Sequence, residues 1–132
     1  MFSPKVTQYL SSQEVGRIAT ATLDGKPHLT AVSYINDKKQ VYFLTMTKSK
    51  KVRNIKKNNK VSFIVDDTPP PTGWRYVILE GTAELISDTV EFERLLKLIY
   101  GKYSAMEGAY SIDKDTYSMI VIQPEKVLTA NL

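Results

Sequence analysis

The sequence predicts a mainly β protein, a small barrel of six strands with helices at its mouth. Short runs with alternating or β-branched residues recur along the chain, as strands require. Tight-turn residues separate several of these runs, and Asp24-Gly25 is the strongest hairpin signal. Gly16 and Gly81 fall inside predicted strands, where a closing barrel needs a bulge or a close approach. Closure into a barrel also removes exposed strand edges.

The first part of the chain is predicted as one helix and three strands. Residues 6–13 form a short helix with Val6, Tyr9 and Leu10 on one face. The strands are expected at residues 15–22, 28–35 and 40–46. Pro27 opens the second strand, where a missing N–H group is tolerated. Residues 36–39 are expected to form the turn before the third strand.

The second part is predicted as two helices, three strands and two loops. A basic helix ends at residues 58–59, and strands follow at 60–66 and 74–86, separated by a stiff proline loop. Asp88 begins a capping-box-like helix start, and apolar residues then recur at helical spacing to residue 103. Residues 104–115 lack a clear period and are expected to be a loop or lid. The last strand, 117–128, is interrupted by Pro124.

The stretch 45–57 is electrostatically unusual. A helix N-terminus carries about half a positive charge, which favours acidic residues in the first turn. Here the helix starts with Lys48, Lys50 and Lys51, beside the hydroxyls of Thr45, Thr47 and Ser49. Exposed N–H groups, hydroxyls and ammonium groups together suit a phosphate. The alternative is a solvated lysine-rich face whose charges are screened by salt.

The positive charge of the chain is concentrated in this one region. Seven basic side chains and no acid lie between residues 48 and 60, at positions 48, 50, 51, 53, 56, 57 and 60. The formal net charge of the whole chain is +4. Outside residues 48–60, however, 14 acidic side chains outnumber the remaining 11 of the 18 basic ones. A local basic patch favours a discrete anionic ligand over nucleic acid, whose footprint is usually broader. Aromatic residues interleaved with the lysines, as single-stranded nucleic acid would require, are also absent from the basic stretch.

Composition narrows the remaining possibilities. The length of 132 residues predicts a single domain, residues 1–132. The sequence has no cysteine and one histidine, His28, which argues against thiol catalysis and a multi-histidine metal site. No apolar run approaches the ~20 residues of a membrane span, and the first residues lack the pattern of a secretory signal. A cytoplasmic protein without metal or membrane contacts is therefore expected.

Several segments, taken in order, resemble the pyridoxamine 5′-phosphate oxidase-like split-barrel family. The resemblance is carried by residues 15–20, 24–28, 32–34, 50–58, 61–66, 74–77, 80–85 and 123–127. It covers nearly the whole chain. The resemblance implies a six-stranded split barrel of the FMN-binding type that pairs as a homodimer, with flavin mononucleotide (FMN) at the dimer interface. In one branch of the family the cofactor is instead the deazaflavin coenzyme F-420.

The resemblance also implies which residues hold the cofactor. By position, the phosphate contacts fall on Ser49, Lys50 and Lys51, with Thr45 on the preceding strand. The flavin ring is implied to lie along Thr30, Ala31 and Val32. Charge patterning points to the same lysines independently, and Thr47 adds a further hydroxyl.

Trp74, Arg53 and His28 lie outside this set. The broad apolar face of Trp74 suits either stacking on the cofactor or covering the dimer interface. Arg53 is expected to pair with an acid across the interface rather than reach the phosphate. His28 is expected to be structural. No catalytic acid or base is predicted, because a flavin supplies its own redox chemistry.

The predicted function is therefore that of an FMN- or deazaflavin-dependent oxidoreductase acting on a small molecule. A non-catalytic cofactor carrier or sensor on the same barrel is the alternative. Pyridoxamine phosphate oxidation itself is not expected. The vitamin B6 oxidases carry an arginine at the start of the second strand, where this chain has Pro27 and His28, and an arginine-rich C-terminal extension that is not present after Leu132.

Overall fold

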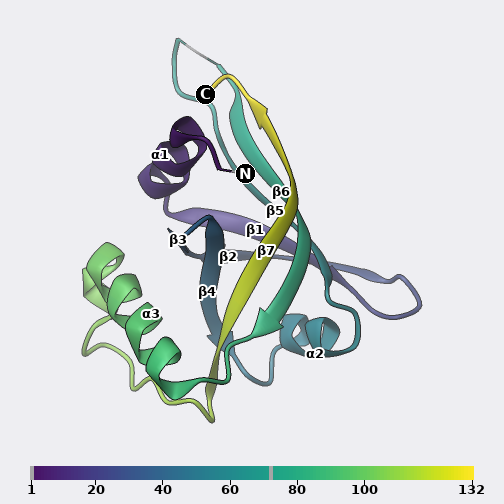
Figure 1. Ribbon diagram of the computed structural model, residues 1–132, viewed down its shortest axis with the longest axis vertical. Coiled ribbons are helices and arrows are strands. Elements are labelled where there is room, and N and C mark those ends of the chain that lie inside the picture. The colour runs from purple at the N-terminus through teal and green to yellow at the C-terminus, as the bar shows by residue number, and fades with distance from the viewer. Residues whose placement is uncertain (1, 72) are drawn as a thin grey trace.

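A curled, fully antiparallel sheet forms the body of the protein in the computed structural model, which describes residues 2–71 and 73–132 (Figure 1). The strand order is β2-β1-β5-β6-β7-β4-β3. The strands are β1 Val15–Ala21, β2 Pro27–Ser33, β3 Ile35–Asp37, β4 Gln40–Met46, β5 Lys60–Asp67, β6 Arg75–Leu85 and β7 Tyr117–Ala130. The helices are α1 Pro4–Ser12, α2 Lys50–Lys57 and α3 Thr89–Lys102, with a short 3-10 turn at Ser104–Met106. The predicted mainly β split barrel is confirmed, with seven strands among the described residues in place of six.

The extra strand arises because the predicted strand 28–35 is broken at Tyr34. The Tyr34 N–H donates to the Tyr103 hydroxyl at 3.0 Å instead of continuing the ladder. Ile35 then starts β3, which pairs with β4 through Asn36 and Asp37, so the prediction of a turn over 36–39 was wrong in part. The turn itself is Lys38–Lys39, both with positive φ (49° and 66°). A hydrogen bond between two tyrosines about seventy residues apart leaves no local signal of such a break.

The glycine inside β6 does mark a bulge, as predicted. The β6–β7 register shifts between Glu80 and Gly81, and Gly81 lies opposite Pro124. A Cβ at position 81 would stand 2.1 Å from the Gln123 carbonyl oxygen, so only glycine fits. The prediction that Pro124 interrupts the last strand was right for the pairing but wrong for the strand: the register skips Glu125 beside Pro124, yet β7 continues to Ala130.

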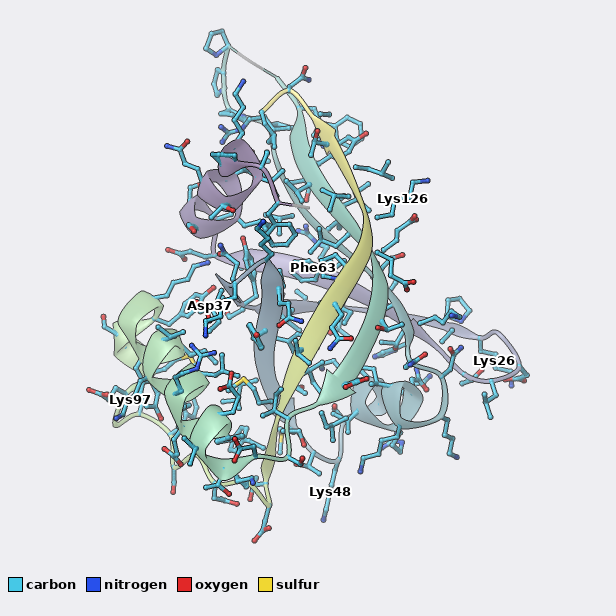
Figure 2. All side chains as sticks on the ribbon, in the orientation of Figure 1. Lys26, Asp37, Lys48, Phe63, Lys97 and Lys126 are labelled. Atoms are coloured by element: carbon cyan, nitrogen blue, oxygen red, sulfur yellow. The ribbon has the colours of Figure 1, made fainter. Side chains whose placement is uncertain are left out.

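Two buried apolar clusters fill the molecule. The larger one lies inside the curled sheet and includes Phe63, Phe43 and Tyr34, with α1 and α2 contributing Leu10 and Val52. The smaller cluster packs α3 against β4 and β7 through Phe92, Leu95, Ile99 and Met119. Figure 2 shows Phe63 near the middle of the fold. No helix among residues 2–71 and 73–132 has the length and apolarity to cross a bilayer.

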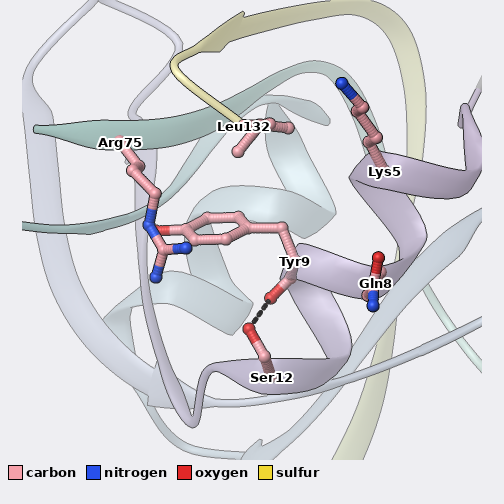
Figure 3. A pocket seen from close by; sticks show the side chains of 6 residues that line it. All are labelled: Lys5, Gln8, Tyr9, Ser12, Arg75 and Leu132. Atoms are coloured by element: carbon pink, nitrogen blue, oxygen red, sulfur yellow. Dashed lines mark hydrogen bonds between the residues drawn. The ribbon is translucent and has the colours of Figure 1, made fainter. Parts of the chain in front are cut away.

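An ion pair and a tyrosine join α1 to the far end of the sheet. The Arg75 guanidinium donates to both Asp67 carboxylate oxygens at 2.9 and 2.7 Å, and the Tyr9 hydroxyl donates to Asp67 Oδ1 at 2.7 Å. Arg75 also lies 4.9 Å from the centre of the Tyr9 ring. Figure 3 shows Arg75 beside Tyr9 in a hollow bordered by Lys5 and Gln8. The hydrogen bonds from Arg75, followed by the one from Tyr9, lower the pKa of Asp67.

This lowered pKa predicts an acid-sensitive contribution to stability. A carboxyl whose pKa is lower in the folded state stabilises the fold above its unfolded pKa of about 4 and loses that contribution as pH falls through the folded pKa. In urea unfolding, Asp67→Asn should therefore be less stable than the wild type at neutral pH, and the difference should shrink below about pH 4. The exposed Asp115, replaced in the same way, provides the control. A difference that stays constant with pH would contradict the ionic origin.

Candidate functional site

The start of α2 is formed by a tight exit from β4. After Met46 the chain turns, and the Ser49 N–H donates to the Met46 carbonyl at 3.0 Å. Ser49 is the N-cap, and its hydroxyl accepts from the Val52 N–H at 3.4 Å. The helix therefore begins at Lys50, later than the basic stretch itself, because Thr45 and Met46 still belong to β4. The Ser49 cap satisfies one of the helix's leading N–H groups and leaves neighbouring ones at the surface.

Buried contacts hold α2 against β1. Val52 and Ile55 are buried in the main core. The Asn54 amide, which is also buried, donates to the Thr20 hydroxyl at 3.0 Å. One turn later the Asn58 amide donates to the Thr22 carbonyl at 3.3 Å. Burying the polar groups of Asn54 and Thr20 is favourable only when they are hydrogen-bonded to each other. This hydrogen bond therefore fixes the position of α2 on β1.

The basic side chains around α2 form no ion pair in the part of the chain that the structure describes. Within residues 2–71 and 73–132, none of the seven basic side chains at positions 48–60 forms a salt bridge, whereas Arg17, Arg75 and Arg94 all do. The first turn of α2 has no acidic residue. Arg53 donates to the Lys48 carbonyl at 2.7 Å, which does not neutralise it. The start of α2 is thus a concentrated positive charge held on a rigid element.

The two central lysines have different surroundings. Lys50 lines a hollow of about 390 Å³ between α2 and the β1–β2 turn, together with Arg53, Lys57 and Asp24. Lys51 is not one of its lining residues and is half-buried. Desolvation by that burial lowers the pKa of Lys51. An ammonium that is partly removed from water without a carboxylate gains more from a bound anion than an exposed one does.

Hydroxyl groups gather where β4 meets β7. Thr45 lies opposite Ser118 in the ladder, and the Thr47 and Ser118 hydroxyls are 2.8 Å apart. Thr47 and Ser118 border a hollow of about 300 Å³ whose wall includes Phe92 and Lys114. Sequence reasoning found Thr45 and Thr47 but missed Ser118 and Lys114. Both come from the far end of the chain, and nothing local marks them.

The predicted ring-binding residues share a strand but not a face. Thr30 is half-buried and Val32 is buried, so both side chains face the inside of the curl. Ala31 is exposed on the outside, opposite Arg17 of β1. Because β2 is an edge strand, one of its backbone edges remains open for a further contact.

A family profile described as pyridoxamine 5′-phosphate oxidase matches residues 2–131. The chain belongs to this family. The profile match confirms the predicted resemblance over nearly the whole length and agrees with the curled antiparallel sheet.

Other proteins similar to this chain are named for different activities and ligands. A reductase from Streptomyces rimosus, named for 5a,11a-dehydrotetracycline and 5a,11a-dehydrooxytetracycline, is 38% identical over 91 residues. That match covers 64% of this chain and 64% of the reductase. The structure also resembles a FAD-binding protein of Mesorhizobium loti, with a TM-score of 0.76, 22% identity and coverage of 96% of this chain and 92% of that one. It also resembles HutZ, the haem storage protein of Vibrio cholerae, with a TM-score of 0.80, 14% identity and coverage of 96% of this chain and 92% of that one. At such identities the structural likeness establishes the fold alone.

One predicted site residue lies apart from the others. Trp74 immediately precedes β6, and Figure 1 shows this end of β6 far from α2. It is 56% exposed, and its ring meets Tyr76 edge-on with centroids 5.4 Å apart. Its backbone carbonyl accepts from the Asn131 amide at 2.7 Å. Within one copy of the chain, Trp74 and the start of α2 therefore do not form one site.

Proposed function

We propose that this member of the pyridoxamine 5′-phosphate oxidase family is a flavin-dependent oxidoreductase that holds FMN or the deazaflavin coenzyme F-420 by its phosphate. The observation that carries the proposal is the start of α2. Lys48, Lys50 and Lys51 gather there with no acidic residue in the first turn and no salt bridge in the described chain. The reductase name of the 38% identical relative supports redox chemistry over a carrier role.

The residues present fit a phosphate. Ser49, Lys50 and Lys51 would hold it, with exposed N–H groups of the helix start. Thr45 lies opposite Ser118 in the ladder, and Thr47, whose hydroxyl meets that of Ser118, borders a separate hollow. Lys51 supplies a half-buried cation and Lys50 an exposed one. When bound, the flavin supplies the hydride chemistry, and the protein supplies binding, orientation and exclusion of water. The edge strand β2, with Thr30, Ala31 and Val32, is proposed to lie along the ring.

A homodimer would complete the site. The outer face of β1 and β2 exposes Val15 (46%), Leu29 (65%) and Ala31, and apolar surface of this kind favours a protein partner. Because Trp74 lies far from α2 in one copy, we propose that Trp74 of a second copy approaches the ring. Such a cofactor would be enclosed only in the pair.

Cofactor titration tests this function directly. The purified protein is mixed separately with FMN, coenzyme F-420, riboflavin and haemin, and binding is followed by the visible spectrum and by flavin fluorescence. Stoichiometric binding of FMN or coenzyme F-420, much tighter than that of riboflavin, is the expected result. Sedimentation of the loaded protein should give twice the chain mass of 14.9 kDa. Binding of haemin alone would overturn the proposal, and flavin that binds but cannot be reduced by any nicotinamide or substrate donor would identify a carrier.

A further inference from the structure

The proposed phosphate site does not use the hollow where β4 meets β7. This hollow lies where β4 and β6 end and β7 begins, beside the start of α3 (Figure 1). Its volume of about 300 Å³ is at the lower end of the range for small-molecule pockets, about 300–1,000 Å³. An apolar wall with a few polar groups is also typical of such pockets. The wall and the polar groups come from segments far apart in the chain, namely Leu85, Ile86 and Phe92 for the wall and Thr47, Lys114 and Ser118 for the polar groups.

The first polar group is a pair of hydroxyls. Thr47 Oγ1 and Ser118 Oγ are 2.8 Å apart, and Ser118 is only 8% exposed. Each hydroxyl carries a single hydrogen, so one of the two hydrogens lies between the oxygens and the other is left over. No hydrogen bond among the described residues uses this second hydrogen. The pair therefore offers a donor to the hollow that both residues line.

The second polar group is the ammonium of Lys114, which is held beside the start of α3. It donates to the Ser87 carbonyl at 2.7 Å and to the Thr89 hydroxyl at 3.0 Å. Ser87 itself lines the hollow, so this contact keeps the nitrogen at the edge of the hollow. An ammonium has three N–H groups, and one of them remains for a ligand.

No carboxylate of the described residues lines the hollow or pairs with Lys114. Asp113 accepts hydrogen bonds from two backbone N–H groups of its own turn. Asp88 caps α3 by accepting from a backbone N–H group. Asp115 is exposed and forms no ion pair in the described chain. The hollow thus combines one fixed cation, one free hydroxyl donor and the positive end of the α3 dipole, which together favour an anion.

We propose that this hollow binds a small carboxylic acid, distinct from the cofactor. Its carboxylate accepts hydrogen bonds from the Lys114 ammonium and from the hydroxyl pair. Its apolar body lies against Ile86 and Phe92. A carboxylate carries one negative charge, which matches the single cation that lines the hollow. A phosphate monoester carries about 1.5–2 negative charges at neutral pH and is better matched by the several lysines at the start of α2.

Titration of the whole protein with benzoate, with its neutral analogue benzamide and with phenyl phosphate tests the proposal. Amide shifts in nuclear magnetic resonance spectra of the nitrogen-15-labelled protein show where each compound binds and how tightly. Benzoate is expected to shift the signals of Thr47, Ser87 and Ser118. It should bind there at least about tenfold more tightly than benzamide, because only benzoate gains a hydrogen bond between charged groups. Phenyl phosphate should instead shift the signals of Lys50 and Lys51.

Two variants and a control separate the contribution of the charge from that of the hydroxyl pair. Lys114→Gln can keep the hydrogen bond to the Ser87 carbonyl but removes the charge. It should lower the affinity for benzoate about tenfold, to that of benzamide, and leave the affinity for benzamide unchanged. Ser118→Ala should weaken both compounds about threefold, because both carry an oxygen that accepts from the hydroxyl. Lys126→Gln removes an exposed lysine without a salt bridge and should change neither affinity.

Three results would each overturn the proposal: equal affinities of the wild type for benzoate and benzamide, equal losses in the Lys114 and Lys126 variants, or benzoate shifts confined to the start of α2. The first comparison uses the wild type alone and so does not depend on the folding of a variant. The proposed function is tested separately by the response of α2 to phenyl phosphate. Benzoate binding in the hollow without that response would contradict the phosphate site and leave this inference standing.

Discussion

Phe63→Ala is expected to lower the free energy of unfolding by about 3–5 kcal/mol, the largest stability loss we predict for this chain. Phe63 is 1% exposed and faces the inside of the curled sheet from β5. Its ring meets the Tyr34 ring edge-on at 5.3 Å, and Tyr34 is itself fully buried. Replacing the ring by a methyl group removes these contacts and leaves a cavity that the rigid sheet fills only in part. Urea unfolding followed by circular dichroism measures the loss.

The exposed Tyr110 provides the matched control, because Tyr110→Ala removes a ring of similar size from the surface. That variant should stay within about 0.5 kcal/mol of the wild type. A similar loss in both variants would show that Phe63 is not the centre of the core.

Gly16 provides a second test of the packing around Phe63. A Cβ added at Gly16 would stand 2.2 Å from the tip of the Phe63 ring, which is well inside contact distance. Gly16→Ala alone should therefore destabilise the protein by overpacking, by about 1–3 kcal/mol. In the Phe63→Ala background the added methyl group enters the cavity, and its cost should fall to near zero or change sign. A double-mutant cycle with no coupling would contradict this packing.

The elements with strong local signals were predicted well, and most of the misses involve distant contacts. The Asp88 cap, the bulge at Gly81 and strands such as Gln40–Met46 depend on residues close together in sequence. The break at Tyr34 depends on Tyr103, nearly seventy residues away. The start of α1 is a local exception: the helix begins at Pro4, capped by Ser3, two residues before the predicted start. Apolar periodicity alone does not reveal a capping hydroxyl that precedes it.

The candidate site also has parts that the sequence predicted and parts that it did not. Charge and hydroxyl content revealed the start of α2, because all of its residues lie within one short stretch. The hydroxyl of Ser118, the Asn54–Thr20 hydrogen bond and the hollow beside Lys114 each join segments far apart in the chain. No periodicity or composition records such juxtapositions. The separation of Trp74 from α2 is likewise a feature of the three-dimensional structure. This separation is the reason why the proposed function places Trp74 of a second copy at the cofactor.

Lys50→Ala combined with Lys51→Ala is expected to weaken binding of a phosphorylated flavin at least about 100-fold. A hydrogen bond to a charged group contributes about 1.5–3 kcal/mol, and each 1.4 kcal/mol is a factor of ten in affinity. Riboflavin lacks the phosphate, so its affinity should change less than about threefold. The half-buried Lys51 should account for the larger share, because its ammonium is partly desolvated before the anion arrives. Fluorescence titration of FMN and riboflavin against each single variant and the double variant measures these differences.

The same charge change elsewhere in the basic stretch, residues 48–60, separates a bound phosphate from a general attraction to anions. Lys56 and Lys60 are exposed, make no salt bridge in the described chain and do not line the hollow beside Lys50. Replacing both by alanine removes two charges but should weaken FMN binding less than about fivefold, and this effect should disappear at high salt because exposed charges are screened. The loss in the Lys50 and Lys51 variant should persist at high salt. An equal loss in the two double variants would mean that the basic helix attracts anions without holding a phosphate at its start.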